Sequence, residues 1–200
     1  MEKKVCAILL AGGSGRRMNM DVTKQRLSVG GLSVMKRTLI AFDLCESISD
    51  IILVCREDET EFAKKEAEGI SKLRKIVNGG KNRLVSAKNG FLAIDFDTDL
   101  VAIHDVARCM ITPEMITNVV KDAIKFGAAS ASSLVVDTVK RIDDEGFIVG
   151  TENRSELRLA GTPQIFCKES YGRAILSADE DDLTLTDDNS LMERVGTRIF

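Results

Sequence analysis

The sequence predicts an α/β domain in which a mostly parallel, twisted sheet is flanked by helices and carries a β-hairpin arm. Three observations predict this class. Short apolar runs alternate with amphipathic stretches along most of the chain. The first apolar run, Val5–Leu10, passes directly into a glycine-rich loop. Between Ala128 and Ile165 the alternation stops, and β-forming residues surround an acidic turn.

Each expected element has its own sequence signal. Apolar residues at helical spacing predict the helices, and short continuous apolar runs predict buried strands. Pro113 suits the first turn of a helix, because the N–H that proline lacks would have no partner there. In chain order we expect strand Val5–Leu10, helix Ser33–Cys45, strand Ile51–Cys55, helix Glu59–Gly69, strand Ile76-Val77, helix Arg83–Ile94, strand Leu100–Ile103, helix Pro113–Phe126 and, beyond the arm, a helix from Lys168 and another near Asn189–Val195.

The arm is predicted from a break in the βαβ pattern. Ser133–Ile142 is rich in β-forming residues, Asp143–Gly146 has the composition of a turn, and Phe147–Gly150 is β-forming again. No internal repeat or low-complexity segment is present. We therefore expect a single domain over residues 1–200, with an arm at about residues 137–160.

Composition and charge are those of an ordinary globular domain. Of the 200 residues, 44% are hydrophobic and 30% charged, and the formal net charge is −3. This charge argues against a nucleic-acid binder with a dense basic surface, whereas a phosphorylated small molecule needs only a few placed cations. Five cysteines without a C-x-x-C pair predict reduced thiols and a cytoplasmic location. No apolar stretch is long enough to span a bilayer, so we expect no membrane contact.

The glycine-rich loop predicts a phosphate-binding site. It spans Ala11–Arg17 with the sequence A-G-G-S-G-R-R, and Lys24-Gln25 follow. Small residues let backbone N–H groups approach a polyphosphate closely, and nearby cations offset the charge that moves onto a leaving pyrophosphate. A tight turn with incidental surface cations is the alternative. The strand before the loop and the cations after it favour phosphate binding.

A second group of polar side chains follows the strand Leu100–Ile103. His104, Asp105 and Arg108 come where a parallel strand would end, and open α/β sheets bind ligands at that edge. Asp105 could hold Mg²⁺ on a triphosphate, and Arg108 could hold the phosphate of an acceptor. For His104, the only histidine, we expect a structural hydrogen bond. A phosphate acceptor is already anionic and needs little help from a base.

Three further motifs are weaker. Asn78–Ser86 places two glycines before a helix, which fits either a phosphate-binding nest or a polar helix cap. Asp137–Lys140, Asn153-Arg154 and Thr162–Gln164 flank the hairpin, and by themselves they indicate only a polar arm with an exposed edge. Thr186–Glu193 by itself indicates a helix cap with acids that the helix dipole favours.

Taken together, these motifs resemble those of the 2-C-methyl-D-erythritol 4-phosphate cytidylyltransferases. The resemblance runs from Val5 to Gly196, in the family's order, through A-G-G-x-G-x-R-M, K-Q, G-G-x-x-R-x-x-S, H-D-x-A-R, D-T-x-K, a lone arginine before T-P-Q, and T-D-D-x-S. It implies a Rossmann-like nucleotidyltransferase fold and a homodimer formed through the arm. It also implies cytidylyl transfer from CTP to a polyol phosphate for isoprenoid synthesis, with release of pyrophosphate and with Mg²⁺ or another divalent cation.

The resemblance further implies roles for individual residues. Arg17 and Lys24 would stabilise the transition state as the acceptor's phosphate attacks the α-phosphorus of CTP. Asp105 and Val106 would lie beside the ligand, and Asp105 would also hold the metal. The cytosine, ribose and triphosphate would be held by Ala11, Gly12, Gly13, Gly80 and Ser86. The methylerythritol phosphate would be surrounded by Arg108, Thr186, and Thr138 and Arg154 of the partner's arm.

The chain departs from the family pattern at four positions. Thr23 replaces the proline before K-Q, and Gly161 replaces the glutamine before T-P-Q. Val106 replaces an alanine and Cys109 a proline beside the expected ligand, where they would change affinity or substrate preference. The family also continues past Gly196 with an N-x-K segment whose lysine contacts the nucleotide's phosphates. We therefore expect that the C-terminal end is incomplete.

Two other functions fit the same motifs. Ribitol-5-phosphate cytidylyltransferases carry out the same chemistry on a wall-polymer precursor and share the A-G-G loop. The segment Asp137–Arg141 and the R-x-x-L of Arg154–Leu157 look more like the isoprenoid enzyme. A nucleotide-binding protein without turnover is the alternative from another class, and the C-terminal departure motivates it.

Overall fold

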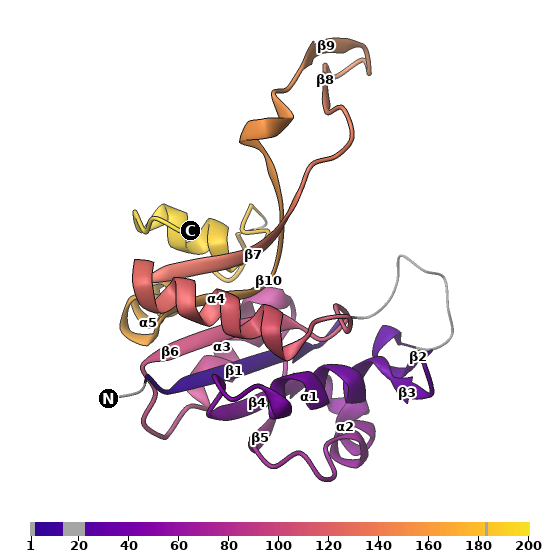
Figure 1. The fold of residues 1–200 in the computed structure, drawn as a ribbon, viewed down its shortest axis with the longest axis vertical. Coiled ribbons are helices and arrows are strands. Elements are labelled where there is room, and N and C mark those ends of the chain that lie inside the picture. The colour runs from indigo at the N-terminus through magenta and orange to yellow at the C-terminus, as the bar shows by residue number, and fades with distance from the viewer. Residues whose placement is uncertain (1–2, 14–22, 183) are drawn as a thin grey trace.

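The computed structural model describes residues 3–13, 23–182 and 184–200 (Figure 1). Its centre is a six-stranded sheet with the order β5-β4-β1-β6-β10-β7. Strand β1 (Val5–Ala11) lies between β4 (Asp50–Cys55) and β6 (Leu100–Asp105) and is parallel to both, and β4 is parallel to β5 (Leu73–Asn78). All seven residues of β1 are buried. The prediction of a mostly parallel α/β sheet is therefore confirmed.

The other edge of the sheet differs from the prediction. Strand β10 (Arg158–Cys167) pairs antiparallel with both β6 and β7 (Ala128–Leu134). The sequence predicted neither strand of this edge, and we expected Thr162–Gln164 to be part of a polar exposed edge. That expectation is wrong, because Thr162, Pro163 and Gln164 are buried in β10. The polar side chains of Thr162 and Gln164 form hydrogen bonds inside the domain, so their polarity did not predict exposure to solvent.

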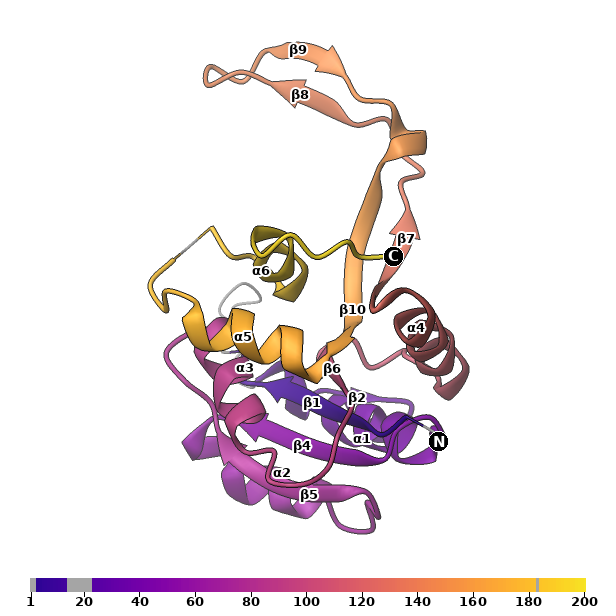
Figure 2. The same ribbon diagram turned by 90° about the vertical axis from the view of Figure 1, so that its left-hand side faces the viewer.

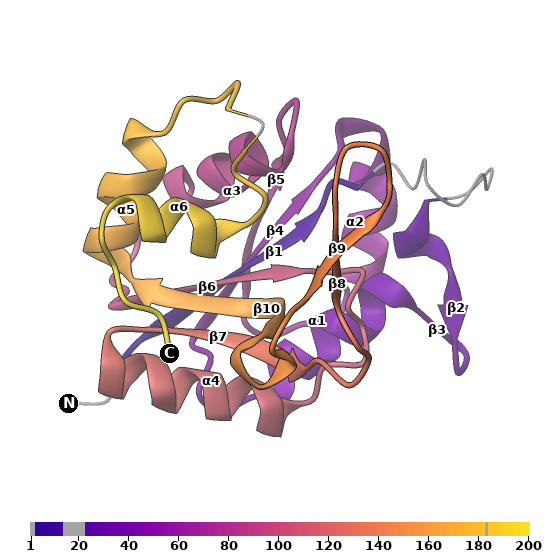
Figure 3. The same ribbon diagram turned by 90° about the horizontal axis from the view of Figure 1, so that it is seen from above.

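Helices cover both faces of the sheet, and Figure 3 shows the two layers. Side chains of β1 alternate between two cores: Val5 and Leu9 contribute to one, and Ile8 and Leu10 to the other. The first core is covered by α1 (Val34–Leu44), α2 (Thr60–Glu66) and α4 (Pro113–Phe126). The second core is covered by α3 (Arg83–Leu92), α5 (Lys168–Ser177) and α6 (Asp188–Arg194).

The shorter elements lie at the ends of these strands and helices. The 3-10 turn η2 (Lys24–Arg26) leads into a two-stranded sheet of β2 (Ser28–Val29) and β3 (Leu32–Ser33). A second 3-10 turn, η3 (Glu57–Glu59), connects β4 to α2. Helix α2 is shorter than the predicted Glu59–Gly69, because Glu59 belongs to the 3-10 turn and the helix ends at Glu66, before a turn that closes at Gly69.

The arm is an antiparallel hairpin of β8 (Lys140–Ile142) and β9 (Ile148–Thr151), which forms a sheet of its own. Figures 1 and 2 show it projecting away from the body beyond β7 and β10. The 3-10 turn η4 (Arg154–Glu156) connects β9 back to β10. The hairpin and its Asp143–Gly146 turn lie where the break in the alternation predicted them.

Within the described ranges, no helix has both the length and the apolar character needed to cross a membrane.

Candidate functional site

A pocket of about 730 Å³ opens where β1, β4 and β5 end. Parallel strands end at the same edge of a sheet, so segments far apart in sequence meet there. The pocket is lined by Gly12, Arg56, Glu57, Asp58, Gly79, Gly80, Lys81 and Ser86. Three residues predicted to hold a nucleotide (Gly12, Gly80 and Ser86) are thus brought to one cavity.

The segment between β5 and α3 forms one wall of the pocket. The Ser86 hydroxyl accepts a hydrogen bond from the Gly80 N–H at 3.0 Å and donates to the Asn82 carbonyl at 2.8 Å. Asn82 also caps α3 by accepting from the Val85 N–H at 2.8 Å. A Cβ atom on Gly80 would lie 2.2 Å from Val85 Cγ1. Only glycine therefore fits at position 80, and the motif is both a helix cap and a pocket wall.

The start of the glycine-rich loop also lines the pocket. Ala11 is the buried last residue of β1, Gly12 lines the pocket, and Gly13 is exposed. Lys24 follows in η2 and is half-buried. The predicted residue Arg17, with Arg16, lies outside the described residues.

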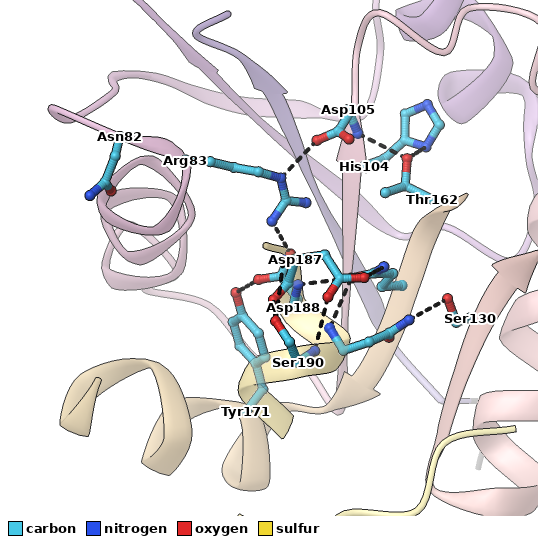
Figure 4. A network of polar contacts seen from close by, with 12 residues as sticks. Asn82, Arg83, His104, Asp105, Ser130, Thr162, Tyr171, Asp187, Asp188 and Ser190 are labelled. Atoms are coloured by element: carbon cyan, nitrogen blue, oxygen red, sulfur yellow. Dashed lines mark hydrogen bonds and ion pairs between the residues drawn. The ribbon is translucent and has the colours of Figure 1, made fainter. Parts of the chain in front are cut away.

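A polar network joins the end of β6 to α3 and α6 (Figure 4). Arg83 bridges two carboxylates: its Nε lies 3.1 Å from Asp105 Oδ1 and its Nη1 2.6 Å from Asp188 Oδ2. Arg108 Nε lies 3.7 Å from the other oxygen of Asp105. Burial acts to lower the pKa of Arg83, but the two carboxylates outweigh it and raise this pKa. Arg83 thus stays charged and orients Asp105 at the sheet edge.

Gln164 docks α6 onto the sheet. Its Oε1 accepts from the N–H groups of Asp188 at 3.0 Å and Asn189 at 3.1 Å, and its Nε2 donates to Asp187 Oδ2 at 2.7 Å. Asp187 also caps α6 in a reciprocal pair with Ser190. Asp187 therefore forms the helix cap that the sequence offered as the alternative for the segment Thr186–Glu193. Thr186, expected at the acceptor, is exposed immediately before the cap.

We expect Tyr171→Phe to lower the free energy of unfolding by about 1.5 to 3 kcal/mol, the usual value of a hydrogen bond to a charged group. Tyr171 is fully buried, and its hydroxyl donates to Asp188 Oδ1 at 2.6 Å. Burial raises the pKa of Tyr171 well above its usual value, so the hydroxyl keeps its proton. Urea denaturation measures the loss.

Thr98→Val is the matched control for Tyr171→Phe. Thr98 is also buried, but its hydroxyl has no hydrogen-bond partner in the part of the chain that the structure describes. We expect its removal to change the stability little. An equal loss in both variants would contradict the assignment of the Tyr171 effect to Asp188.

His104 has a structural environment. It is fully buried, and its Nδ1 lies 3.0 Å from the Thr162 hydroxyl, which also accepts from the Asp105 N–H at 3.1 Å. Burial lowers the pKa of His104 to about 4. The ring is therefore neutral near pH 7 and has no route to a ligand, in agreement with the expected structural hydrogen bond.

Val106 requires a correction. We expected it beside the ligand, but it is fully buried in the core that α1 and α4 cover. Its N–H donates to the Leu10 carbonyl at 3.0 Å, and its carbonyl accepts from the Thr38 hydroxyl at 2.9 Å. Its side chain therefore packs in the core and is not among those that line the pocket. A valine in place of a smaller residue thus fills the core.

The predicted acceptor residues are divided between body and arm. Arg108 is exposed next to Asp105. A Cβ atom added to Gly161 would lie 3.8 Å from the Nη1 atom of Arg108. Thr138 lies between β7 and β8 and Arg154 lies in η4, and both are exposed and absent from the lining of the pocket. Arg154 donates to the Val136 carbonyl. Arg154 does not pair with its acidic neighbours Glu152 and Glu156 in the described structure, where Arg141 pairs with Glu152 and Asn153 with Glu156.

Several site residues were not predicted from the sequence. Arg56, Glu57 and Asp58 line the pocket, and Arg56 donates to both Asp58 oxygens at 2.8 and 2.6 Å. They directly follow β4, so the same signal that selected Asp105 would have found them. Arg83 lay within a recognised motif, but its two carboxylate partners are separated from it by 22 and 105 residues. No local pattern reveals such partners.

Asp105 is the one carboxylate that the sequence predicted as a metal ligand. No group of three or more potential metal-ligating side chains occurs among the residues that the structure describes. Asp105 is half-buried and pairs across the sheet with Leu10, two residues before Gly12. Mg²⁺ is usually held by one or two carboxylates together with substrate phosphates and water. Asp105 therefore fits a Mg²⁺ ion that is bound jointly with a nucleotide, and not a site made by protein alone.

Known proteins resemble this chain over nearly its whole length. A family model described as 2-C-methyl-D-erythritol 4-phosphate cytidylyltransferase matches residues 5–199. The relative of that name from Clostridium perfringens is 36% identical over 199 residues, which cover 98% of this chain and 88% of the relative. The relative of that name from Caldanaerobacter subterraneus subsp. tengcongensis is 38% identical over 198 residues, which cover 98% of this chain and 87% of the relative.

Solved structures show the same likeness. The 4-diphosphocytidyl-2C-methyl-D-erythritol synthase from Anaerococcus prevotii superposes with a TM-score of 0.87 at 30% identity, covering 99% of this chain and 86% of its own. The 2-C-methyl-D-erythritol 4-phosphate cytidylyltransferase from Thermus thermophilus superposes with a TM-score of 0.73 at 26% identity, covering 100% of this chain and 87% of its own. The likeness therefore spans the pocket, the polar network and the arm together.

Proposed function

Because this chain belongs to the 2-C-methyl-D-erythritol 4-phosphate cytidylyltransferase family, we propose that it transfers a cytidylyl group from CTP to 2-C-methyl-D-erythritol 4-phosphate. The products are 4-diphosphocytidyl-2-C-methyl-D-erythritol and pyrophosphate. The observation that carries this function is the pocket at the strand ends, where Gly12, Gly80 and Ser86 meet. A cavity walled by a glycine-rich loop and a helix N-terminus suits a nucleoside triphosphate.

The proposed reaction is an in-line displacement. A phosphate oxygen of the acceptor forms a bond to the α-phosphorus of CTP, and the bond from that phosphorus to the bridging oxygen breaks. Pyrophosphate leaves with the bonding electrons, so negative charge grows on it in the transition state. We assign Lys24 and Arg17 to this developing charge. Arg108, exposed beside Asp105, is assigned to the acceptor's phosphate.

We assign Asp105 as the residue that holds Mg²⁺. When bound, the ion would supply positive charge at the phosphate oxygens of CTP. Arg83 orients Asp105 from one side through the contact at 3.1 Å, and Arg83 is itself fixed by the buried Asp188. This anchoring holds the Asp105 carboxylate at the carboxyl end of β6.

We also propose that two copies of the chain pair through their arms. The arm and the parts of β7 and β10 next to it expose large apolar side chains, which a chain alone would leave in water, and such patches mark interfaces between proteins. They are Leu134, Val136, Ile142, Phe147, Ile148, Val149 and Leu159. In a two-fold dimer, Thr138 and Arg154 of one arm would reach the acceptor side of the partner's pocket.

Pyrophosphate release tests the proposed function. We expect release that requires both CTP and Mg²⁺, and that is faster with 2-C-methyl-D-erythritol 4-phosphate than with ribitol 5-phosphate. Equal or faster turnover with ribitol phosphate would overturn the choice of acceptor. CTP binding without turnover of any polyol phosphate would favour a nucleotide-binding protein without catalysis.

A further inference from the structure

Gln25 is a buried polar side chain that the proposed chemistry does not use. It follows Lys24 in η2 and is 3% exposed. Its Nε2 donates to the Ala11 carbonyl at 2.6 Å and to the Gly13 carbonyl at 3.3 Å. One carboxamide thus spans the end of β1 and the start of the glycine-rich loop.

These two contacts fix the direction of the loop backbone. In a trans peptide the carbonyl and the N–H point to opposite sides. Because Gln25 holds the Ala11 carbonyl, the Gly12 N–H of the same peptide is directed away from Gln25. Gly12 lines the pocket. Glycines leave a loop free to adopt other conformations, so an external clamp has a large ordering effect on it.

The turn that carries Gln25 is anchored at its other side by Glu59. This carboxylate is 6% exposed, and it accepts from Arg26 Nε at 2.9 Å and from the Thr23 hydroxyl at 3.3 Å. Arg26 also lies over the Phe62 ring, 4.5 Å from its centroid. The Thr23 hydrogen bond to Glu59 thus restrains the residue directly before η2.

We propose that Gln25 is a positioning residue, which joins the glycine-rich loop to the turn carrying Lys24 and holds the two at a fixed separation. The contacts with Glu59 hold the turn in place. The hydrogen bonds of the Gln25 carboxamide then hold the start of the loop against this turn. Catalysis by a placed cation depends on such geometry, because misplacement by about 1 Å can cost 100-fold in rate. The inference rests on the proposed cytidylyl transfer.

Two variants at position 25 test the proposal. Gln25→Met keeps the length of the side chain and removes the donor, and Gln25→Glu replaces the donor with a carboxylate that faces two carbonyl oxygens. We expect each to lower kcat/KM for CTP by roughly 10- to 100-fold, the size expected when a buried acceptor loses its donor. CTP affinity, measured by calorimetric titration, should weaken as well. Thr98→Val, a buried substitution just before the N-terminal end of β6, should stay within about twofold of wild type.

A double-mutant cycle separates positioning from general structural damage. If Gln25 acts on turnover by placing Lys24 against the loop, Gln25→Met should lower kcat by less than about threefold in a Lys24→Ala background. Full multiplication of the two losses, or unchanged kcat/KM in both Gln25 variants, would overturn the proposal. Failure of the wild type to release pyrophosphate would instead overturn the proposed function. The effect of Gln25→Met on CTP affinity would then still test the clamp.

Discussion

Lys24→Ala is expected to lower kcat on the order of 100- to 1000-fold, the usual cost of losing one electrostatic donor to a transition state. CTP affinity should change far less, because the charge that Lys24 meets grows on the pyrophosphate only as the bond breaks. Lys24 lies in η2 directly before Gln25, whose carboxamide contacts the glycine-rich loop. Steady-state kinetics with varied CTP measures kcat and KM separately.

Lys65→Ala is the matched control, since Lys65 is an exposed lysine in α2 that does not line the pocket. It loses the same charge and should keep wild-type kinetics. If Lys24→Ala raised only the KM for CTP and left kcat unchanged, Lys24 would be a binding residue and its proposed role would be wrong.

Heterodimers of Lys24→Ala and Arg154→Ala are expected to regain about half of the wild-type activity, although each variant alone is nearly inactive. Arg154 lies on the arm and Lys24 in the body of the same chain. In a dimer that shares its sites, one site of the heterodimer carries both substitutions and the other carries neither. The variants are refolded together, heterodimers are isolated with two affinity tags, and pyrophosphate release is measured.

Lys24→Ala paired with Arg108→Ala is the control for this experiment. Both of these residues lie in the body, so each site of that heterodimer keeps one defect and no recovery is expected. Absence of recovery with the Arg154 variant, in heterodimers shown to form, would place Arg154 and Lys24 in one protomer's site. The proposal of a shared arm would then be wrong.

The parallel part of the fold was predictable because its signals are local. A strand buried on both faces gives a continuous apolar run, as in Val5–Leu10, and the structure extends it by one residue to Ala11. Pro113 marks the first residue of α4, and that helix ends at the predicted Phe126. The polar residues after these strands were predictable as site residues, since parallel strands end at one edge.

The antiparallel edge was not predictable in the same way. β7 has the sequence A-A-S-A-S-S-L, which is neither strongly apolar nor strictly alternating. β10 carries Thr162 and Gln164 in its buried half. These polar residues are buried because His104 and the start of α6 satisfy their hydrogen bonds. Sequence patterns report hydrophobicity, and they do not report a hydrogen-bond partner elsewhere in the chain.

The sequence by itself determined the α/β class, the glycine-rich loop, the arm and the ordered motifs that resemble one family. Each of these depends on residues that are close together in the chain. Only the tertiary structure decided that Val106 belongs to the core, that Arg83 joins Asp105 to Asp188, and that Gln25 holds Ala11 and Gly13. These contacts form because strand pairing and packing bring together residues that are distant in the chain, and that proximity leaves no local pattern.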